Sequence, residues 1–260
     1  MTDDATRHLL DRFLHAVRPL PSLLAVWAHG SLAGGDYRPG RSDLDLIAVV
    51  ARRCPPDEEE FLTRAHTALD ETLPLAEGLH CTYVAADEWA DPDRPHFTWA
   101  HRQTQYRPVT LVTRRELHVF GRVLHGPPPA DLLPPVGDAD LAGFVRRDLR
   151  TYWRPAVDHP ARWLQDVWVD LGLLTLARAR VTLATGRLIT KGEALDVLTG
   201  LGAPADVVDD IRRRRYGTPP PASPAWRARR ADATRAFLAP AIERTLAEYD
   251  PLPRRPSRGS

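Results

Sequence analysis

The chain has 260 residues, a length that fits one large domain or two small ones. Hydrophobic residues make up 43% and charged residues 27%, the balance of an ordinary globular protein, and a net charge of +1 predicts no general attraction to nucleic acid or acidic membranes. Because the sequence has no long apolar run, a polar first segment and only two cysteines, we expect a cytoplasmic protein without a membrane span, signal peptide or disulfide framework. We also expect a monomer.

Helix and strand signals alternate along the first half of the chain. An amphipathic pattern predicts a helix over residues 3–17, and the prolines that follow end it. A second helix, with prolines and acidic residues at its start, is predicted over residues 57–72. Short apolar runs predict strands at about residues 23–28, 43–50, 79–84, 109–112 and 123–125.

The second half of the chain shows helical periodicity and no strand signals. Helices are predicted at about residues 138–152, 161–185, 190 onward, 204–215 and 226–249. The segment before them is rich in proline, as linkers often are. We therefore expect an α/β domain, a linker, an all-helical domain and a disordered tail, over residues 1–126, 127–137, 138–250 and 251–260.

The strongest chemical signal is the pair Gly30-Ser31, followed by the run Asp43-Leu44-Asp45 at the start of an apolar strand. Side chains two apart in a strand point to the same face, so Asp43 and Asp45 lie together. Two adjacent carboxylates repel one another unless a cation lies between them, and Mg²⁺ prefers such oxygen ligands. Small residues at the glycine-serine turn let a phosphate chain approach the backbone. The combination predicts phosphoryl or nucleotidyl transfer.

Each part of this signal has a simpler explanation when it is taken alone. A Gly-Ser pair is usually a turn, and an Asp-x-Asp pair is often a solvated strand edge. Two better-known motifs do not fit: no Gly-Lys-Ser/Thr sequence follows the glycines, as a P-loop requires, and Ala33 stands where a nucleophile elbow needs glycine. The order of the two parts, each beside a predicted strand, favours the transferase hypothesis.

The segment HGSLAGGDYRPGRSDLDLIAVV resembles the signature of the polymerase-β-like nucleotidyltransferase superfamily. The later segment LTLARARVTLATGRLITKGEAL is similar to the helical domain of the aminoglycoside adenylyltransferases that modify streptomycin and spectinomycin. The resemblance implies a nucleotidyltransferase domain with a mixed sheet, followed by a helical bundle. It also implies Mg²⁺ as cofactor, and transfer of AMP from ATP to an antibiotic hydroxyl at a site between the two domains.

The resemblance also assigns roles to single residues. Asp43 and Asp45 would bind Mg²⁺, and His80 would stand at the position of the catalytic base. Trp99 and Trp168 would lie near the acceptor. The remaining residues would contact ATP: Gly30, Ser31, Ser42, Arg178, Lys191 and Tyr216. Lys191 is the single lysine of the chain, and a compact ammonium suits a phosphate oxygen.

Two departures from the family pattern leave alternatives open. The family has a glutamate as base where this chain has His80, and the nearest acid, Glu77, would face the other side of a regular strand. The family also has an aspartate where Trp168 stands, so a less cationic acceptor would suit this site. The alternatives are a nucleotidyltransferase that modifies proteins, as in toxin–antitoxin pairs, and a protein that binds a nucleotide or antibiotic without turnover.

Overall fold

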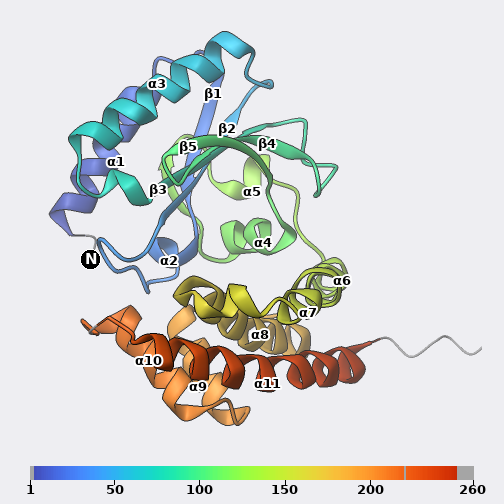
Figure 1. The fold of residues 1–260 in the computed structure, drawn as a ribbon. Coiled ribbons are helices and arrows are strands. Elements are labelled where there is room, and N and C mark those ends of the chain that lie inside the picture. Colours follow the sequence, from blue (N-terminus) through green and yellow to red (C-terminus); the bar gives the residue numbers. More distant parts are fainter. Residues whose placement is uncertain (1–2, 220, 251–260) are drawn as a thin grey trace, which may run out of the picture. The chain divides into compact units, whose positions relative to one another are not determined.

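The structure is a computed structural model that describes residues 3–219 and 221–250, and it divides into two compact units after Gly137 (Figure 1). The first unit combines a mixed sheet with helices, and the second is helical. This architecture confirms the predicted fold class. The predicted disordered tail lies outside the described residues.

The sheet of the first unit has six strands in the order β5-β4-β3-β2-β1-β6. Its central pair, β2 and β3, is parallel, and every other neighbouring pair is antiparallel. The strands are β1 (Leu23–Ala28), β2 (Leu44–Val50), β3 (Leu79–Ala85), β4 (Pro95–Ala100), β5 (Gln103–Pro108) and β6 (Arg122–His125). Because β2 lies between β1 and β3, residues at its start are flanked by the last residues of β1 and the first residues of β3.

Two helices, α1 (Asp4–Val17) and α3 (Pro56–Thr72), lie side by side over one face of the sheet (Figure 1). The Asp3 side chain caps α1 by accepting a hydrogen bond from the Thr6 backbone N–H. Both helices present apolar side chains to the strands, among them Phe13 and Leu62, which are fully buried. These side chains form the apolar core on this face of the sheet.

The opposite face is covered in part by α4 (Leu111–Phe120) and α5 (Pro129–Leu132), around a second apolar core. The Trp27 indole N–H donates a 2.8 Å hydrogen bond to the Pro127 carbonyl, and Leu133 is buried. The proline-rich segment predicted as a linker is thus packed on the first unit in the structure.

The sequence prediction is wrong about the strands between residues 95 and 112. Strands β4 and β5 were not predicted, and the strand predicted at residues 109–112 does not form. Thr110 caps α4 there, because its side chain accepts a hydrogen bond from the Thr113 N–H. Two residues with positive φ, His101 and Arg102, make the tight turn between β4 and β5.

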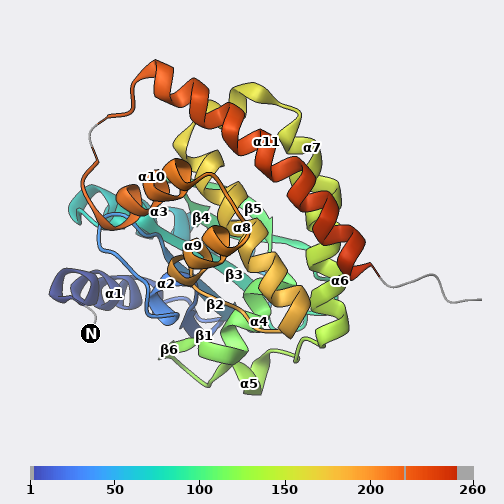
Figure 2. The same cartoon turned by 90° about the horizontal axis from the view of Figure 1, so that it is seen from below.

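The second unit is built around α8, with α11 packed along it (Figure 2). A fully buried Arg230 on α11 donates hydrogen bonds to Asp210 and Asp166 at 2.9 and 2.6 Å, which fixes α11 to two other helices. The longer helices are α6 (Asp138–Asp148), α8 (Asp166–Thr185), α9 (Lys191–Gly200), α10 (Ala205–Tyr216) and α11 (Pro224–Tyr249). Shorter turns are α7 (Arg154–Val157), a π-helical turn over Leu149–Trp153 and a 3₁₀ turn over Pro160–Leu164. Within the described ranges, no helix has the length and apolar character needed to cross a bilayer.

Candidate active site

Asp43, Asp45 and His80 form a cluster where β2 and β3 begin. The register of these parallel strands pairs Asp45 with His80, and Asp43 comes directly before β2. One ligand atom from each side chain lies within 4.8 Å of the others, and His80 Nδ1 is 3.5 Å from Asp45 Oδ1. Asp43 is exposed and His80 is buried, so the cluster opens to solvent on one side. The three residues that the sequence predicted to act together do lie together.

A divalent cation fits this cluster. Two carboxylates at this separation repel one another, and a cation between them removes that cost. Gly30 leaves room for the Asp45 carboxylate, because a Cβ there would lie 2.7 Å from Asp45 Oδ2. Gly30 also has φ +61°, which favours glycine. Carboxylate oxygens suit Mg²⁺, which keeps positions for water and phosphate oxygens.

The Gly30-Ser31 pair lies beside the cluster, in the short helical turn α2 (Gly30–Ala33) that follows β1. The His29 N–H donates a 2.9 Å hydrogen bond to the Asp45 carbonyl, which ties this turn to the start of β2. Ser42, also predicted to contact the nucleotide, accepts a hydrogen bond from the Arg38 N–H and shapes the loop before Asp43. The structure therefore brings all three residues to the same end of the sheet.

A histidine–glutamate pair that the sequence analysis missed adjoins the cluster. His29 Nδ1 lies 3.3 Å from Glu116 Oε2, and both side chains are largely buried. Burial by itself lowers the pKa of the His29 imidazole, but the hydrogen bond to Glu116 and the charge of Asp45 outweigh it and leave the pKa raised. A charged His29 would help to offset the negative charge of Asp45.

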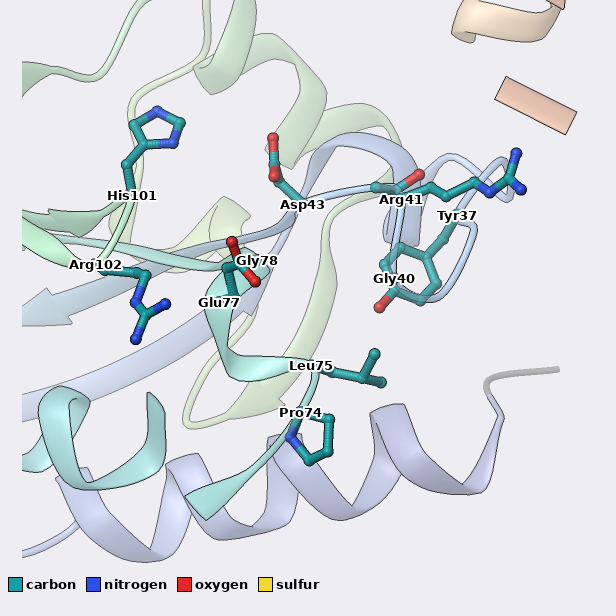
Figure 3. A pocket seen from close by; sticks show the side chains of 11 residues that line it. Tyr37, Gly40, Arg41, Asp43, Pro74, Leu75, Glu77, Gly78, His101 and Arg102 are labelled. Carbon is teal, nitrogen blue, oxygen red and sulfur yellow. The ribbon is translucent and has the colours of Figure 1, made fainter. Parts of the chain in front are cut away.

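A cavity of about 380 Å³ opens beside Asp43, and Figure 3 shows side chains that line it. Glu77 and His101 line this cavity together with Asp43. The expectation that Glu77 faces away from the site is wrong, because residue 77 lies in a 3₁₀ turn over Ala76–Gly78 and not in the strand. The sequence analysis did not identify His101, whose ring centroid lies 4.6 Å from that of His80. Burial, and then the neighbouring His80, lower the pKa of His101.

A smaller cavity of about 120 Å³ lies on the sheet face that carries Asp45 and His80. Arg107 lines it from β5, the edge strand. Burial lowers the pKa of the Arg107 guanidinium, and the charges of Asp45 and Asp43 oppose that change. The cavity has a mixed polar and apolar wall, which includes His29 and two residues of the cluster, Asp45 and His80.

Trp99 does not line either cavity, contrary to the role predicted for it. It lies across from Cys81 in the β3–β4 register, so its side chain is on the sheet face that packs against α3. The Trp99 ring stacks on His66 with centroids 5.2 Å apart, and the residue is 5% exposed. Trp99 is a core residue behind the sheet.

In the helical unit, the structure brings Arg178 and Lys191 close together. Arg178 Nε donates a 3.0 Å hydrogen bond to the Ile189 carbonyl, directly before the start of α9. Thr190 and Glu193 cap that helix reciprocally, as predicted, and Lys191 is its first residue. Arg178 therefore supports the segment that presents Lys191.

The other predicted residues of this unit lie on α8 and α10. Tyr216 ends α10 and is 38% exposed, with the Arg215 guanidinium over its ring. Trp168 lies in the first turn of α8 within a cluster of aromatic rings, from Tyr152, Trp153 and Trp163. The carboxylates that flank Trp168 are engaged: Asp166 pairs with Arg230, and Asp170 pairs with Arg214.

The chain has the fold of a known adenyltransferase. Its structure is similar to the crystal structure of spectinomycin adenyltransferase AAD(9) from Enterococcus faecialis with ATP and spectinomycin. The TM-score is 0.71, the match covers 91% of this chain and 99% of that chain, and the sequences are 16% identical. No protein-family model matches the chain, and no curated protein matches it in sequence. The likeness is therefore one of fold: a nucleotidyltransferase domain followed by a helical domain.

Proposed function

We propose that the protein is a nucleotidyltransferase that moves AMP from Mg-ATP to a hydroxyl of an aminocyclitol-like small molecule and releases pyrophosphate. The observation that carries this proposal is the Asp43–Asp45–His80 cluster beside the Gly30-Ser31 turn. The fold supports it, because the similar adenyltransferase was crystallised with ATP and spectinomycin. Transfer of this kind needs positioned reactants and compensation of phosphate charge more than covalent help from the protein.

The residues divide the work as follows. Asp43 and Asp45 would hold the metal ion, which supplies charge neutralisation at the triphosphate when bound. Ser31 and the backbone of its turn would orient the phosphates. His80 has Nδ1 turned to Asp45, so Nε2 would accept the proton of the attacking hydroxyl. The new bond joins that oxygen to the α-phosphorus, and the bond to pyrophosphate breaks.

The helical unit would supply the remaining contacts. Lys191 would act as a point charge on a phosphate oxygen, and Arg178 supports the segment that carries it. Tyr216 would pack against the nucleotide, and Trp168, with its aromatic neighbours, would contact the acceptor. These assignments rest on the motifs that the chain shares with the adenylyltransferases.

Pyrophosphate release with a panel of aminocyclitol and aminoglycoside acceptors tests this function. Asp45→Asn should remove magnesium-dependent ATP binding and pyrophosphate release, because one of the two proposed carboxylate ligands of the metal is gone. Asp11→Asn, an exposed change on α1, is the matched control and should leave both unchanged. Unaltered Mg-ATP affinity in Asp45→Asn would remove the central claim.

A second candidate function is nucleotide binding without turnover, and the observation that favours it is His80 at the position of the base. Wild-type protein that binds Mg-ATP but releases no pyrophosphate with any acceptor, while His80→Glu does release it, would establish that alternative. Transfer of label from α-labelled ATP to a protein of a cell lysate would instead favour a protein-modifying enzyme.

A further inference from the structure

His80 is buried beside Asp45, but its ring makes no hydrogen bond to that carboxylate. The residue is 8% exposed, and its Nδ1 atom lies 3.5 Å from Asp45 Oδ1, which is longer than the usual N–H···O hydrogen bond. Within residues 3–219 and 221–250, neither nitrogen of this ring forms a hydrogen bond. A buried nitrogen thus faces a carboxylate oxygen across a gap.

The 3.5 Å separation of these two atoms suits two ligands of one metal ion. Zn²⁺ binds imidazole nitrogen and carboxylate oxygen at about 2.0–2.2 Å, so two such ligands at a tetrahedral angle stand about 3.4 Å apart. Asp43 completes the group, because one ligand atom from each of the three residues lies within 4.8 Å of the others. Proteins commonly bind Zn²⁺ through three such ligands and leave the fourth position open.

Mg²⁺ and Zn²⁺ would use the three residues of the cluster differently. Mg²⁺ prefers oxygen ligands, so it would bind Asp43 and Asp45 and leave the imidazole outside its coordination sphere. Zn²⁺ and similar first-row transition ions also bind imidazole nitrogen, so they would take His80 Nδ1 as a third ligand. The histidine therefore adds a ligand for transition ions without adding one for Mg²⁺.

The bound ion would decide which nitrogen of His80 can accept a proton. A neutral imidazole carries one hydrogen, and its other nitrogen has the lone pair. With the hydrogen on Nδ1, which faces Asp45, the lone pair of Nε2 is available to the attacking hydroxyl, as the proposed function requires. A transition ion on Nδ1 uses the lone pair of that atom, so the hydrogen must be on Nε2. Water takes the proton from Nδ1 and returns one to Nε2, and the ring stays neutral but loses its acceptor.

We propose, on the basis of the proposed function, that the Asp43–Asp45–His80 cluster is also an inhibitory site for Zn²⁺. The ion would displace Mg²⁺ from the two carboxylates and, by binding His80 Nδ1, remove the proton acceptor of the transfer. Activation by one divalent ion and inhibition by another would thus share one site. The single residue that separates the two effects is His80.

Isothermal titrations of the full chain with Zn²⁺, alone and in competition with Mg²⁺, test the site without an acceptor. Wild-type protein should bind Zn²⁺ more tightly than Mg²⁺, and each ion should displace the other. His80→Gln should weaken Zn²⁺ binding by about tenfold or more and leave Mg²⁺ affinity unchanged. His101→Asn is the matched control and should leave both affinities unchanged. It removes the neighbouring imidazole, which is outside the cluster, and asparagine tolerates the positive φ at that position.

Nitrogen-15 NMR of the histidine rings reads the position of the hydrogen directly, above neutral pH, where ordinary imidazoles are uncharged. The His80 signals are identified by their absence in His80→Gln. They should show the hydrogen on Nδ1 in metal-free and Mg²⁺-loaded wild-type protein, and on Nε2 after Zn²⁺ is added. With an acceptor that supports turnover, Zn²⁺ should inhibit pyrophosphate release, and excess Mg²⁺ should restore it.

The proposal is overturned if wild-type protein binds Zn²⁺ no more tightly than Mg²⁺, or if His80→Gln binds Zn²⁺ as tightly as wild type. It is also overturned if the His80 hydrogen stays on one nitrogen in all three states, or if saturating Zn²⁺ leaves pyrophosphate release unimpaired. The binding and NMR measurements need no turnover. A protein that releases no pyrophosphate with any acceptor would therefore refute the proposed function while the zinc site itself is still confirmed or excluded.

Discussion

Gly30 makes room for Asp45, the proposed metal ligand, because its missing Cβ leaves space for a carboxylate oxygen of that side chain. Gly30→Ala should abolish magnesium-dependent ATP binding by displacing Asp45, and the left-handed backbone should cost about 1–2 kcal/mol of stability. Gly35→Ala is the control: it has φ +78° and open space around its Cβ position, so it has the same backbone cost without the clash. Mg-ATP titrations of the two variants, compared at equal stability, check this. Equal loss of ATP binding in both would contradict the role given to Asp45.

His80 places an imidazole at the third position of the cluster, where the adenylyltransferases that the sequence resembles have a carboxylate. His80→Glu adds a third negative charge beside Asp43 and Asp45, so Mg²⁺ affinity should rise by about tenfold or more. His80→Ala should slow transfer by about 10²–10⁴, the usual share of a general base. Isothermal titration with Mg²⁺ and single-turnover rates measure the two effects, with His15→Glu on α1 as control. A His80→Ala variant as fast as the wild type would show that another residue takes the proton.

At the level of single residues, the sequence predicted the three residues of the cluster but not the residues that line the cavities beside it. Asp43, Asp45 and His80 could be predicted because strand periodicity and a parallel register align them. Glu77 was misplaced because a 3₁₀ turn interrupts that periodicity. His101 and Arg107 reach the site through strands that local patterns did not reveal, and their approach depends on pairing between distant segments.

Among the elements, the hairpin of β4 and β5 explains why part of the fold could not be predicted. Strand β5 is an edge strand with mostly polar residues, so it lacks the apolar alternation that marks a half-buried strand. Its turn uses His101 and Arg102 at positive φ, where asparagine or glycine would have signalled a hairpin. The apolar run that follows was read as a strand, but the Thr110 cap starts a helix there.

The packing of α3 on the sheet predicts how stability depends on pH. Burial lowers the pKa of His66 to about 3, so the folded protein binds its proton less readily than the unfolded chain. This contribution is fully present above the unfolded pKa of about 6.5 and is lost as the pH falls toward 3. Below pH 6, the free energy of unfolding should therefore fall by about 1.4 kcal/mol per pH unit through His66.

Urea unfolding between pH 4 and 6 measures this slope, and His66→Gln should remove it. Trp99→Phe, which disturbs the same ring stack without removing a titratable group, should lower stability but keep the slope. An unchanged slope in His66→Gln would place the acid sensitivity elsewhere in the chain.

For the whole molecule, the division into two units predicts that the first unit binds the divalent cation and that the second unit adds contacts to ATP. The first unit has its own cores on both faces of the sheet, so residues 1–137 should fold alone. This fragment carries Asp43, Asp45 and His80 and should bind divalent cations as the full chain does. It lacks Lys191 and Arg178, and its Mg-ATP affinity should therefore be lower by at least the ~1.5–3 kcal/mol expected of one charge-assisted hydrogen bond. Lys191→Ala in the full chain should show part of that loss, and a fragment that binds Mg-ATP as tightly as the full chain would contradict the role of the helical unit.

Because β6 pairs with β1, the sheet cannot be completed during translation until β6 has been synthesised. Strand β1 is made early, but its partner on the outer side, β6, emerges only after the other strands and α4. At elongation rates of about 5–20 residues per second, the nascent chain keeps this edge of β1 unpaired for several seconds. All six strands precede Asp138, so the first unit can fold while the helical unit is still being translated. Synthesis itself thus favours folding of the carboxylate cluster before Lys191 has left the ribosome.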